Sequence, residues 1–214
     1  MTTTTVLFDL DGTLTDPKAG ITRCIRYALE TLGHPVPDEN TLLWCIGPPL
    51  RESFKRLLNS TSDELVSEAL RLYRERFNQK GKFENHVYPY IPHTLESLKT
   101  SGAKLFIATS KPTVFAEQIA VHFDLAQYFK GIYGSELSGE RSDKKDLIAH
   151  IIRSERLDPS TTLMVGDRYH DMVGAKHNTI KAIGVTYGYG SPDELRQAGA
   201  DAIVDSPAEL STIL

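Results

Sequence analysis

The chain has 214 residues, of which 40% are hydrophobic and 24% are charged, as is typical of a packed globular protein. Its formal net charge of −4 gives no basic footprint, so we expect no nucleic-acid partner. No apolar run approaches the roughly 20 residues of a membrane span, and no secretory signal pattern is visible at the N-terminus. Two cysteines without a CxxC pattern favour reduced thiols and a cytoplasmic location.

The first predicted element is a buried strand over residues 6–10, which ends at the turn residue Gly12. Asp9 and Asp11 stand at the carboxyl end of this strand, where open α/β sheets bind their ligands. Two neighbouring carboxylates repel each other unless a cation or a reacting group uses them. The stretch therefore indicates a functional loop, although an acidic turn after a strand is also common.

Residues 17–88 show helical periodicity and almost no strand pattern. We predict helices over residues 21–32, from about residue 38, over 50–58, and from a capping sequence at 61–64 to about 79. The insert leaves just after the carboxylate pair and returns before the next strand. We therefore expect a helical cap domain over 17–88 that stands over the catalytic edge, and a core domain made of residues 1–16 and 89–214.

From residue 90 onward, helical and strand patterns alternate. We predict helices over 92–101, 112–123, 143–157 and 171–178, and strands over 104–109, 162–165, 182–186 and 202–204. Ser191 and Ser206 each precede a proline and stand three residues before a glutamate, which indicates the starts of two further helices. Such alternation predicts an α/β fold with a doubly wound parallel sheet and helices on both faces.

Polar residues follow several of these strands or begin the helices after them. Thr109, Ser110 and Lys111 end the second strand. A Ser-Asp-Lys-Lys sequence at 142–145 begins a helix, and the sequence Gly-Asp-Arg-Tyr-His-Asp at 166–171 follows a further strand. Hydroxyl groups, lysines and carboxylates in these places are what a phosphate site on an α/β sheet requires.

This ordered set resembles the four motifs of the haloacid dehalogenase superfamily of phosphatases, over nearly the whole chain. The stretches GDRYHDMVGA and IGVTYGYGSPDEL are similar to its phosphoglycolate-phosphatase-like and nucleotidase-like branch. The resemblance implies a Rossmann-like core with a helical cap. It also implies a Mg²⁺-dependent phosphatase that acts on small phosphate monoesters, with phosphoglycolate and nucleoside monophosphates as leading substrates.

The resemblance also implies a role for each motif residue. Asp9 is the nucleophile, and its place at the end of a strand, where the backbone is held, favours the same role. Asp11 is the general acid and base; the dehalogenases of the superfamily lack this second aspartate because a halide leaves without a proton. The expected metal ligands are Asp9, the backbone carbonyl of Asp11, Asp167 and, directly or through water, Asp171. The expected phosphate-binding residues are Gly12, Thr109, Ser110 and Lys144.

Several of these positions have plainer interpretations. Thr109 could cap the following helix, and Asp171 could be an aspartate favoured at a helix N-terminus by the helix dipole. Lys145 competes with Lys144 for the same role. We expect Lys111 at the rim of the site and His170 on a loop facing solvent.

In the cap, Arg51 and Lys80 are possible substrate-specificity residues, or else solvated surface charges. Trp44 could stack on a nucleobase, but packing in the cap is favoured. Two rival functions remain: a phosphomutase of the β-phosphoglucomutase type on the same scaffold, and a non-enzymatic phospho-receiver or binding protein. The large insert and the acidic pair on the first strand argue against a receiver.

Overall fold

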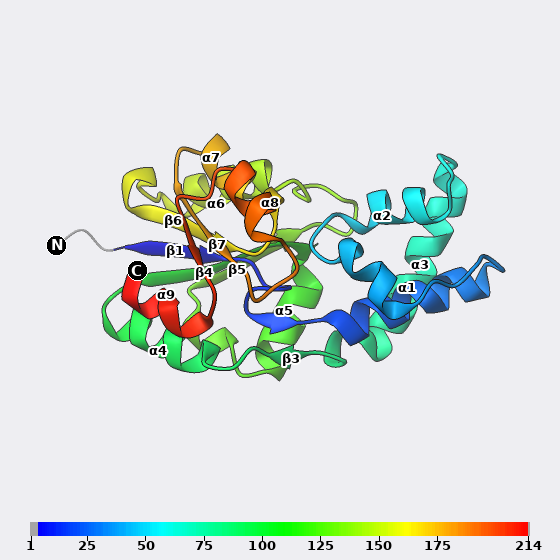
Figure 1. Ribbon diagram of the computed structural model, residues 1–214, viewed down its shortest axis with the longest axis horizontal. Helices are drawn as coiled ribbons and strands as arrows, with labels where there is room; N and C mark the ends of the chain where they lie inside the picture. Colours follow the sequence, from blue (N-terminus) through cyan, green and yellow to red (C-terminus); the bar gives the residue numbers. More distant parts are fainter. Residues whose placement is uncertain (1–3, 214) are drawn as a thin grey trace. The chain divides into compact units, whose positions relative to one another are not determined.

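The core of the protein is a six-stranded parallel sheet, seen in a computed structural model that describes residues 4–213 (Figure 1). Its strand order is β5-β4-β1-β6-β7-β8. The strands are β1 (Thr5–Phe8), β4 (Lys104–Pro112), β5 (Gly131–Ser135), β6 (Thr162–Gly166), β7 (Lys181–Val185) and β8 (Ala202–Val204). The chain runs outward from β1 to β5 and then returns to β6 on the other side of β1. The doubly wound α/β fold predicted from sequence is confirmed.

Helices cover both faces of this sheet. They are α4 (Ile91–Thr100), α5 (Thr113–His122), α6 (Lys144–Glu155), α7 (Tyr169–His177), α8 (Pro192–Gln197) and α9 (Pro207–Ile213). Figure 1 shows α6, α7 and α8 on one side of the sheet and α4 and α9 on the other. On the first side, Leu7 belongs to a buried cluster with Ile148, Met172 and Leu195 from the three helices. Neighbouring residues of a strand face opposite sides of the sheet. All four residues of β1 are buried, so this strand is covered on both faces.

Some predicted boundaries in this part of the chain are wrong. Strand β5 was not predicted, and its sequence Gly-Ile-Tyr-Gly-Ser explains why, since two glycines weaken any strand signal. Strand β4 continues to Pro112, and a shift in its pairing register lies between Ala108 and Pro112. Strand β4 therefore ends three residues beyond its predicted end and includes the polar residues Thr109, Ser110 and Lys111.

Contacts within the chain divide it into two compact units, one formed by Pro17–His86 and the other by the segments on either side of it. The smaller unit contains α1 (Lys18–Thr31), α2 (Leu50–Leu57), α3 (Asp63–Gln79) and two 3₁₀ helices, Glu39–Cys45 and Gly81–Phe83. Helix α3 begins one residue later than its capping sequence suggested, because Ser62, not Thr61, accepts the cap hydrogen bond, from the Leu65 N–H at 3.3 Å. The helix expected near residue 38 is 3₁₀ helix.

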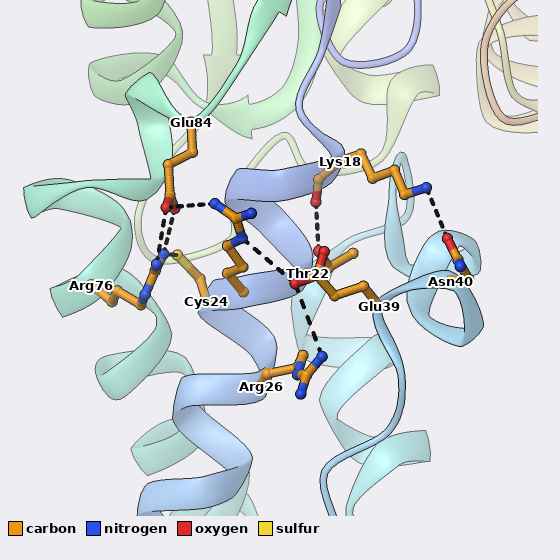
Figure 2. Close-up of polar contacts among 9 residues, drawn as sticks. Lys18, Thr22, Cys24, Arg26, Glu39, Asn40, Arg76 and Glu84 are labelled. Carbon is orange, nitrogen blue, oxygen red and sulfur yellow. Dashed lines mark hydrogen bonds and ion pairs between the residues drawn. The ribbon is translucent and has the colours of Figure 1, made fainter.

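Two short strands, β2 (Thr15–Asp16) and β3 (His86–Val87), pair with each other at the ends of this smaller unit. Glu84 lies just before β3, and its carboxylate accepts hydrogen bonds from Arg76 of α3 at 2.7 Å and from Arg23 of α1 at 3.2 Å. Figure 2 shows Arg76 between Glu84 and the thiol of Cys24. The ion pair with Arg76 lowers the pKa of Glu84 below its ordinary value. These charges join the two long helices to the segment that leaves the unit.

Both cysteines are buried free thiols, in agreement with the expectation of reduced cysteines. Within residues 4–213, no helix is at once long enough and apolar enough to cross a membrane.

Candidate active site

Three neighbouring strands of the larger unit carry the polar residues singled out in the sequence. Asp9 and Asp11 follow β1, Thr109 and Lys111 lie in the last part of β4, and Asp167 follows β6. Strands β4 and β6 both pair with β1 in parallel, so their carboxyl ends lie at one edge of the sheet. This is the edge where the strand order reverses, the usual ligand position in doubly wound folds.

A buried group of carboxylates forms the centre of this edge. Asp9, Asp167 and Asp171 each offer an oxygen, and these oxygens lie within 4.8 Å of one another. Burial, with the neighbouring charges of Asp9 and Asp171, raises the pKa of Asp167 well above its ordinary value. Burial also raises the pKa of Asp171 to about 6. Carboxylates arranged in this way oppose one another's ionisation, so the group favours a cation among them.

The residues present fit a divalent metal ion. Oδ2 of Asp167 accepts a hydrogen bond from the Tyr189 N–H at 2.8 Å, whereas its buried Oδ1 has no hydrogen-bond partner among residues 4–213. When ionised, Asp9, Asp11, Asp167 and Asp171 carry four negative charges at this edge, and the ammonium groups of Lys111 and Lys144 offset two of them. Oxygen ligands with that excess charge suit a hard divalent cation.

Lys144 is the first residue of α6 and points into the carboxylate group. Its Nζ lies 2.9 Å from Oδ1 of Asp9 and 2.5 Å from Oδ1 of Asp171, and it donates to the Ala108 carbonyl at 2.7 Å. Burial lowers the pKa of Lys144, but Asp171 and Asp9 outweigh it and raise the pKa overall. Lys145, the alternative, is half-buried, and its backbone N–H donates to the helix cap Asp143.

Lys111 is buried in the site, and our expectation that it lies at the rim is wrong. Its Nζ lies 2.6 Å from Oδ2 of Asp11, and both side chains are at most 10% exposed. Burial raises the pKa of Asp11 and Lys111 lowers it, with a net shift upward. Lys111 lies in the stretch of β4 where the pairing register shifts, so the regular alternation of a strand does not predict its position.

The backbone around these residues is tightly packed. Gly12 has a φ of +85°, and a Cβ at this position would lie 2.2 Å from Oδ2 of Asp167, so only glycine fits. The Thr109 hydroxyl is buried and accepts from the Lys111 N–H at 3.3 Å. The Ser110 carbonyl accepts a hydrogen bond from the Ser135 hydroxyl at 2.9 Å. The expected phosphate-binding residues Gly12, Thr109, Ser110 and Lys144 thus all lie at this edge.

Asp171 and His170, both in the sequence at 166–171, make further contacts at the start of α7. Asp171 also serves the helix terminus, since its Oδ2 accepts from the Arg168 N–H at 3.1 Å while Oδ1 meets Lys144. His170 does not face solvent; it is half-buried, its ring lies against Tyr169, and burial lowers its pKa to about 4. A histidine in this environment stays neutral at physiological pH.

Arg51, Lys80 and Trp44 lie in the smaller unit, and their contacts are with other residues of that unit. Arg51 forms an ion pair with Asp63 at 3.3 Å and donates to Ser67 at 3.2 Å. Lys80 is exposed at the end of α3, and Trp44 is half-buried beneath the Arg56 guanidinium at 4.3 Å. A role of these residues in substrate choice stays a prediction.

Comparisons with known proteins agree with this geometry. The sequence profile of the haloacid dehalogenase-like hydrolase family matches residues 6–185. A curated protein from Pseudomonas aeruginosa named 5'-nucleotidase is 50% identical over 191 residues, covering 89% of this chain and 86% of its own. A crystal structure of a predicted phosphatase from Clostridium acetobutylicum has a TM-score of 0.95 at 46% identity, covering 100% of this chain and 98% of its own.

More distant curated relatives carry other names. A Mycobacterium tuberculosis protein named tyrosine-protein kinase PtkA is 38% identical over 88% of this chain, which spans 64% of that protein. A Vibrio parahaemolyticus protein named phosphoglycolate phosphatase is 27% identical over 98% of this chain and 95% of its own length. The family profile covers most of the chain, and the residues that resemble the family's motifs lie together at the edge of the sheet. The chain therefore belongs to the haloacid dehalogenase-like hydrolases and is a phosphoric monoester hydrolase.

Proposed function

We propose that the protein is a Mg²⁺-dependent phosphatase that hydrolyses small phosphate monoesters through an aspartyl-phosphate intermediate. The observation that carries this proposal is the buried group of Asp9, Asp167 and Asp171, in which the Lys144 ammonium pairs with Asp9 and Asp171. It supplies a nucleophile, oxygen ligands for a metal and a positive charge beside the reacting phosphoryl group.

In the first step, a carboxylate oxygen of Asp9 attacks phosphorus, and the bond from phosphorus to the ester oxygen breaks. Asp11 gives its proton to the departing alkoxide. Its raised pKa suits this role, because a carboxyl that holds its proton more tightly can act as an acid nearer neutral pH. Lys111 beside Asp11 then stabilises the carboxylate that remains.

In the second step, water attacks the aspartyl phosphate. Asp11 takes a proton from this water, the new oxygen–phosphorus bond forms, and the bond from Asp9 to phosphorus breaks. Inorganic phosphate leaves and Asp9 is regenerated. Lys144 supports both steps, because it faces Asp9 and offsets negative charge as it builds up on the phosphoryl oxygens.

Asp9, Asp167 and Asp171 would hold the metal, with the Asp11 carbonyl as a further ligand. When bound, Mg²⁺ supplies positive charge that lets an anionic nucleophile approach an anionic ester. The hydroxyl of Thr109 and the backbone N–H of Ser110 would bind the remaining phosphate oxygens. Gly12 would contribute by leaving room beside Asp167, since its own N–H is bonded to the Thr15 carbonyl.

Nucleoside 5'-monophosphates are the first substrates to test, because the 50% identical relative is named 5'-nucleotidase. Phosphoglycolate is the second, from the name of the Vibrio relative. We propose further that residues 17–88 act as a cap that selects the leaving group. Changing Arg51 or Lys80 to Ala should then alter the ranking among natural esters, with little effect on a small aryl phosphate.

The test is a phosphate-release assay over a panel of nucleotides, phosphoglycolate, sugar phosphates and an aryl phosphate, with Mg²⁺ and with chelator. Because one relative is named a tyrosine-protein kinase, a second assay offers a tyrosine-containing peptide with a nucleoside triphosphate as phosphoryl donor and measures the phosphopeptide formed. Asp9→Asn should lose at least about 10³-fold in kcat and yield no trapped acyl phosphate. Asp146→Asn, which changes an exposed aspartate on α6, is the matched control. Turnover by Asp9→Asn at the control's rate would exclude the mechanism.

A further inference from the structure

The loop between β7 and α8, residues 186–190, lies directly against the catalytic edge. The Tyr189 N–H donates to Oδ2 of Asp167 at 2.8 Å. A Cβ at Gly188 would lie 2.3 Å from the Gly12 carbonyl oxygen, and one at Gly190 would lie 2.0 Å from the Asp167 carbonyl oxygen. This loop, which we call the tyrosine loop, is therefore packed against Gly12 and Asp167 with no room for side chains at its glycines.

The two phenols of the tyrosine loop hold the chain segment that follows Asp11. The Tyr187 hydroxyl donates to the Thr13 carbonyl at 3.0 Å, and the Tyr189 hydroxyl donates to Oδ1 of Asp16. In Figure 1 the orange connection before α8 runs beside the blue segment after β1. Two positions of a single short segment are thus attached to one loop.

That segment is a compact turn that carries Asp11. The Gly12 N–H donates to the Thr15 carbonyl at 2.8 Å, and the Thr15 N–H donates to the Leu10 carbonyl at 3.0 Å. These bonds fold residues 10–15 into one turn, which contains Thr13 and is followed directly by Asp16, so the two phenols hold the turn that carries Asp11. The Asp11 carboxylate itself is held by Lys111 through Oδ2, and its buried Oδ1 has no hydrogen-bond partner in the described part of the chain.

We propose that Tyr187 and Tyr189 are positioning residues for Asp11, which place its carboxyl where it can protonate the leaving alkoxide. The inference rests on the proposed function, in which Asp11 is the general acid and base. It adds a role for two residues that lie more than 170 positions away in the sequence. General acid catalysis demands such support, because misplacement of the catalytic group by about 1 Å costs on the order of 10²-fold in rate.

The phenols are suited to this role because they remain hydrogen-bond donors. Burial raises the pKa of Tyr187 above its ordinary value, and the charge of Asp167 raises it further. Burial likewise raises the pKa of Tyr189, as does its hydrogen bond to Asp16. Both hydroxyls therefore stay protonated across the pH range of an assay.

The test uses Tyr189→Phe and Tyr187→Phe in the full-length protein. Each variant keeps the ring and the backbone, including the N–H that donates to Asp167, and loses only the hydroxyl. We expect kcat/KM for an alkyl ester such as a nucleoside monophosphate to fall about 10- to 100-fold. This is a part of the rate enhancement that a general acid supplies, because Asp11 remains present but is less well placed. For an aryl phosphate, kcat/KM should stay within about two-fold, because an aryl oxide leaves without a proton.

The Mg²⁺ concentration for half-maximal activity should not change in either variant, since the carboxylate of Asp167 keeps its backbone donor. Tyr133→Phe is the matched control: its hydroxyl also donates to a carboxylate, that of Glu155, between β5 and α6. The control should show the wild-type ratio of alkyl to aryl kcat/KM. If one tyrosine variant fails to fold, the other still tests the inference, because the two phenols hold the same turn at different points.

Two results would overturn the inference: an equal fall of kcat/KM for both esters, or no fall for either. Asp11→Asn in the same assay separates this failure from a failure of the proposed function. If Asp11→Asn shows the dependence on the leaving group and neither tyrosine variant does, the positioning role is wrong. If Asp11→Asn shows no such dependence, the proposed role of Asp11 itself is wrong, and the positioning role falls with it.

Discussion

Lys144→Met removes the positive charge at the centre of the buried carboxylate group while keeping the length of the side chain. The Lys144 side chain is only 3% exposed and its Nζ serves two carboxylates and one carbonyl oxygen. Removing one partner of a buried ion pair costs about 3–5 kcal/mol, because the remaining charge stays buried without compensation. Protonation of a carboxyl relieves part of this cost, and we expect a loss near 3 kcal/mol at pH 8 in the presence of chelator.

The loss should depend on pH. Lys144 lowers the pKa of Asp171, which burial nevertheless raises from an ordinary value of 3.8 to about 6. Without the lysine, this pKa rises further. A carboxyl with a raised pKa in the folded state stabilises the fold below its unfolded pKa and loses that contribution as pH rises through the folded pKa. The difference in free energy of unfolding between wild type and Lys144→Met should therefore be smaller at pH 5 than at pH 8.

Chemical denaturation at the two pH values, with chelator present, measures this difference directly. Lys145→Met is the control, because its half-buried side chain lies one position further along α6, outside the carboxylate group. The same two variants separate the lysines in catalysis: Lys144→Met should depress kcat/KM for every ester, and Lys145→Met should not. Equal stability of Lys144→Met and wild type at pH 8, or a penalty that grows as the pH falls, would refute the electrostatic reasoning.

Asp11→Asn should slow alkyl esters more than aryl esters and let an acyl phosphate accumulate with the aryl substrate, as acid quench and mass spectrometry would show; equal slowing without a trapped intermediate would leave Asp11 only a structural role. Chelation should abolish phosphate release and Mg²⁺ should restore it, whereas Ca²⁺ should inhibit, because its larger coordination sphere can take both oxygens of Asp9; full activity of a metal-free sample would contradict this. Gly12→Ala should weaken Mg²⁺ binding at least tenfold and lower the melting temperature, because the added Cβ would clash with Asp167 and the φ of +85° costs alanine about 1–3 kcal/mol. A wild-type Mg²⁺ affinity in calorimetric titration would argue against a clash between this Cβ and Asp167.

The sequence by itself determined the class of the protein. The apolar strand before Asp9, the Asp-x-Asp pair and the turn at Gly12 are local features, readable because neighbouring residues decide them. Alternation of helix and strand patterns after residue 90 predicted the parallel sheet, and parallel strands bring their carboxyl ends to one edge whatever the loops between them. From this it followed that Asp9, Asp11, Thr109 and Asp167 lie together, as the structure places them.

The tertiary structure decided what depends on contacts between distant positions. The irregular register of β4 brings Lys111 to Asp11, and the N-terminus of α6 aims Lys144 rather than Lys145 at Asp9 and Asp171. The bond from Tyr189 to Asp16 joins residues 173 positions apart. Such pairings are set by how the strands stack beside β1 and how closely backbones approach at the glycines, and no spacing within one segment of the chain encodes them.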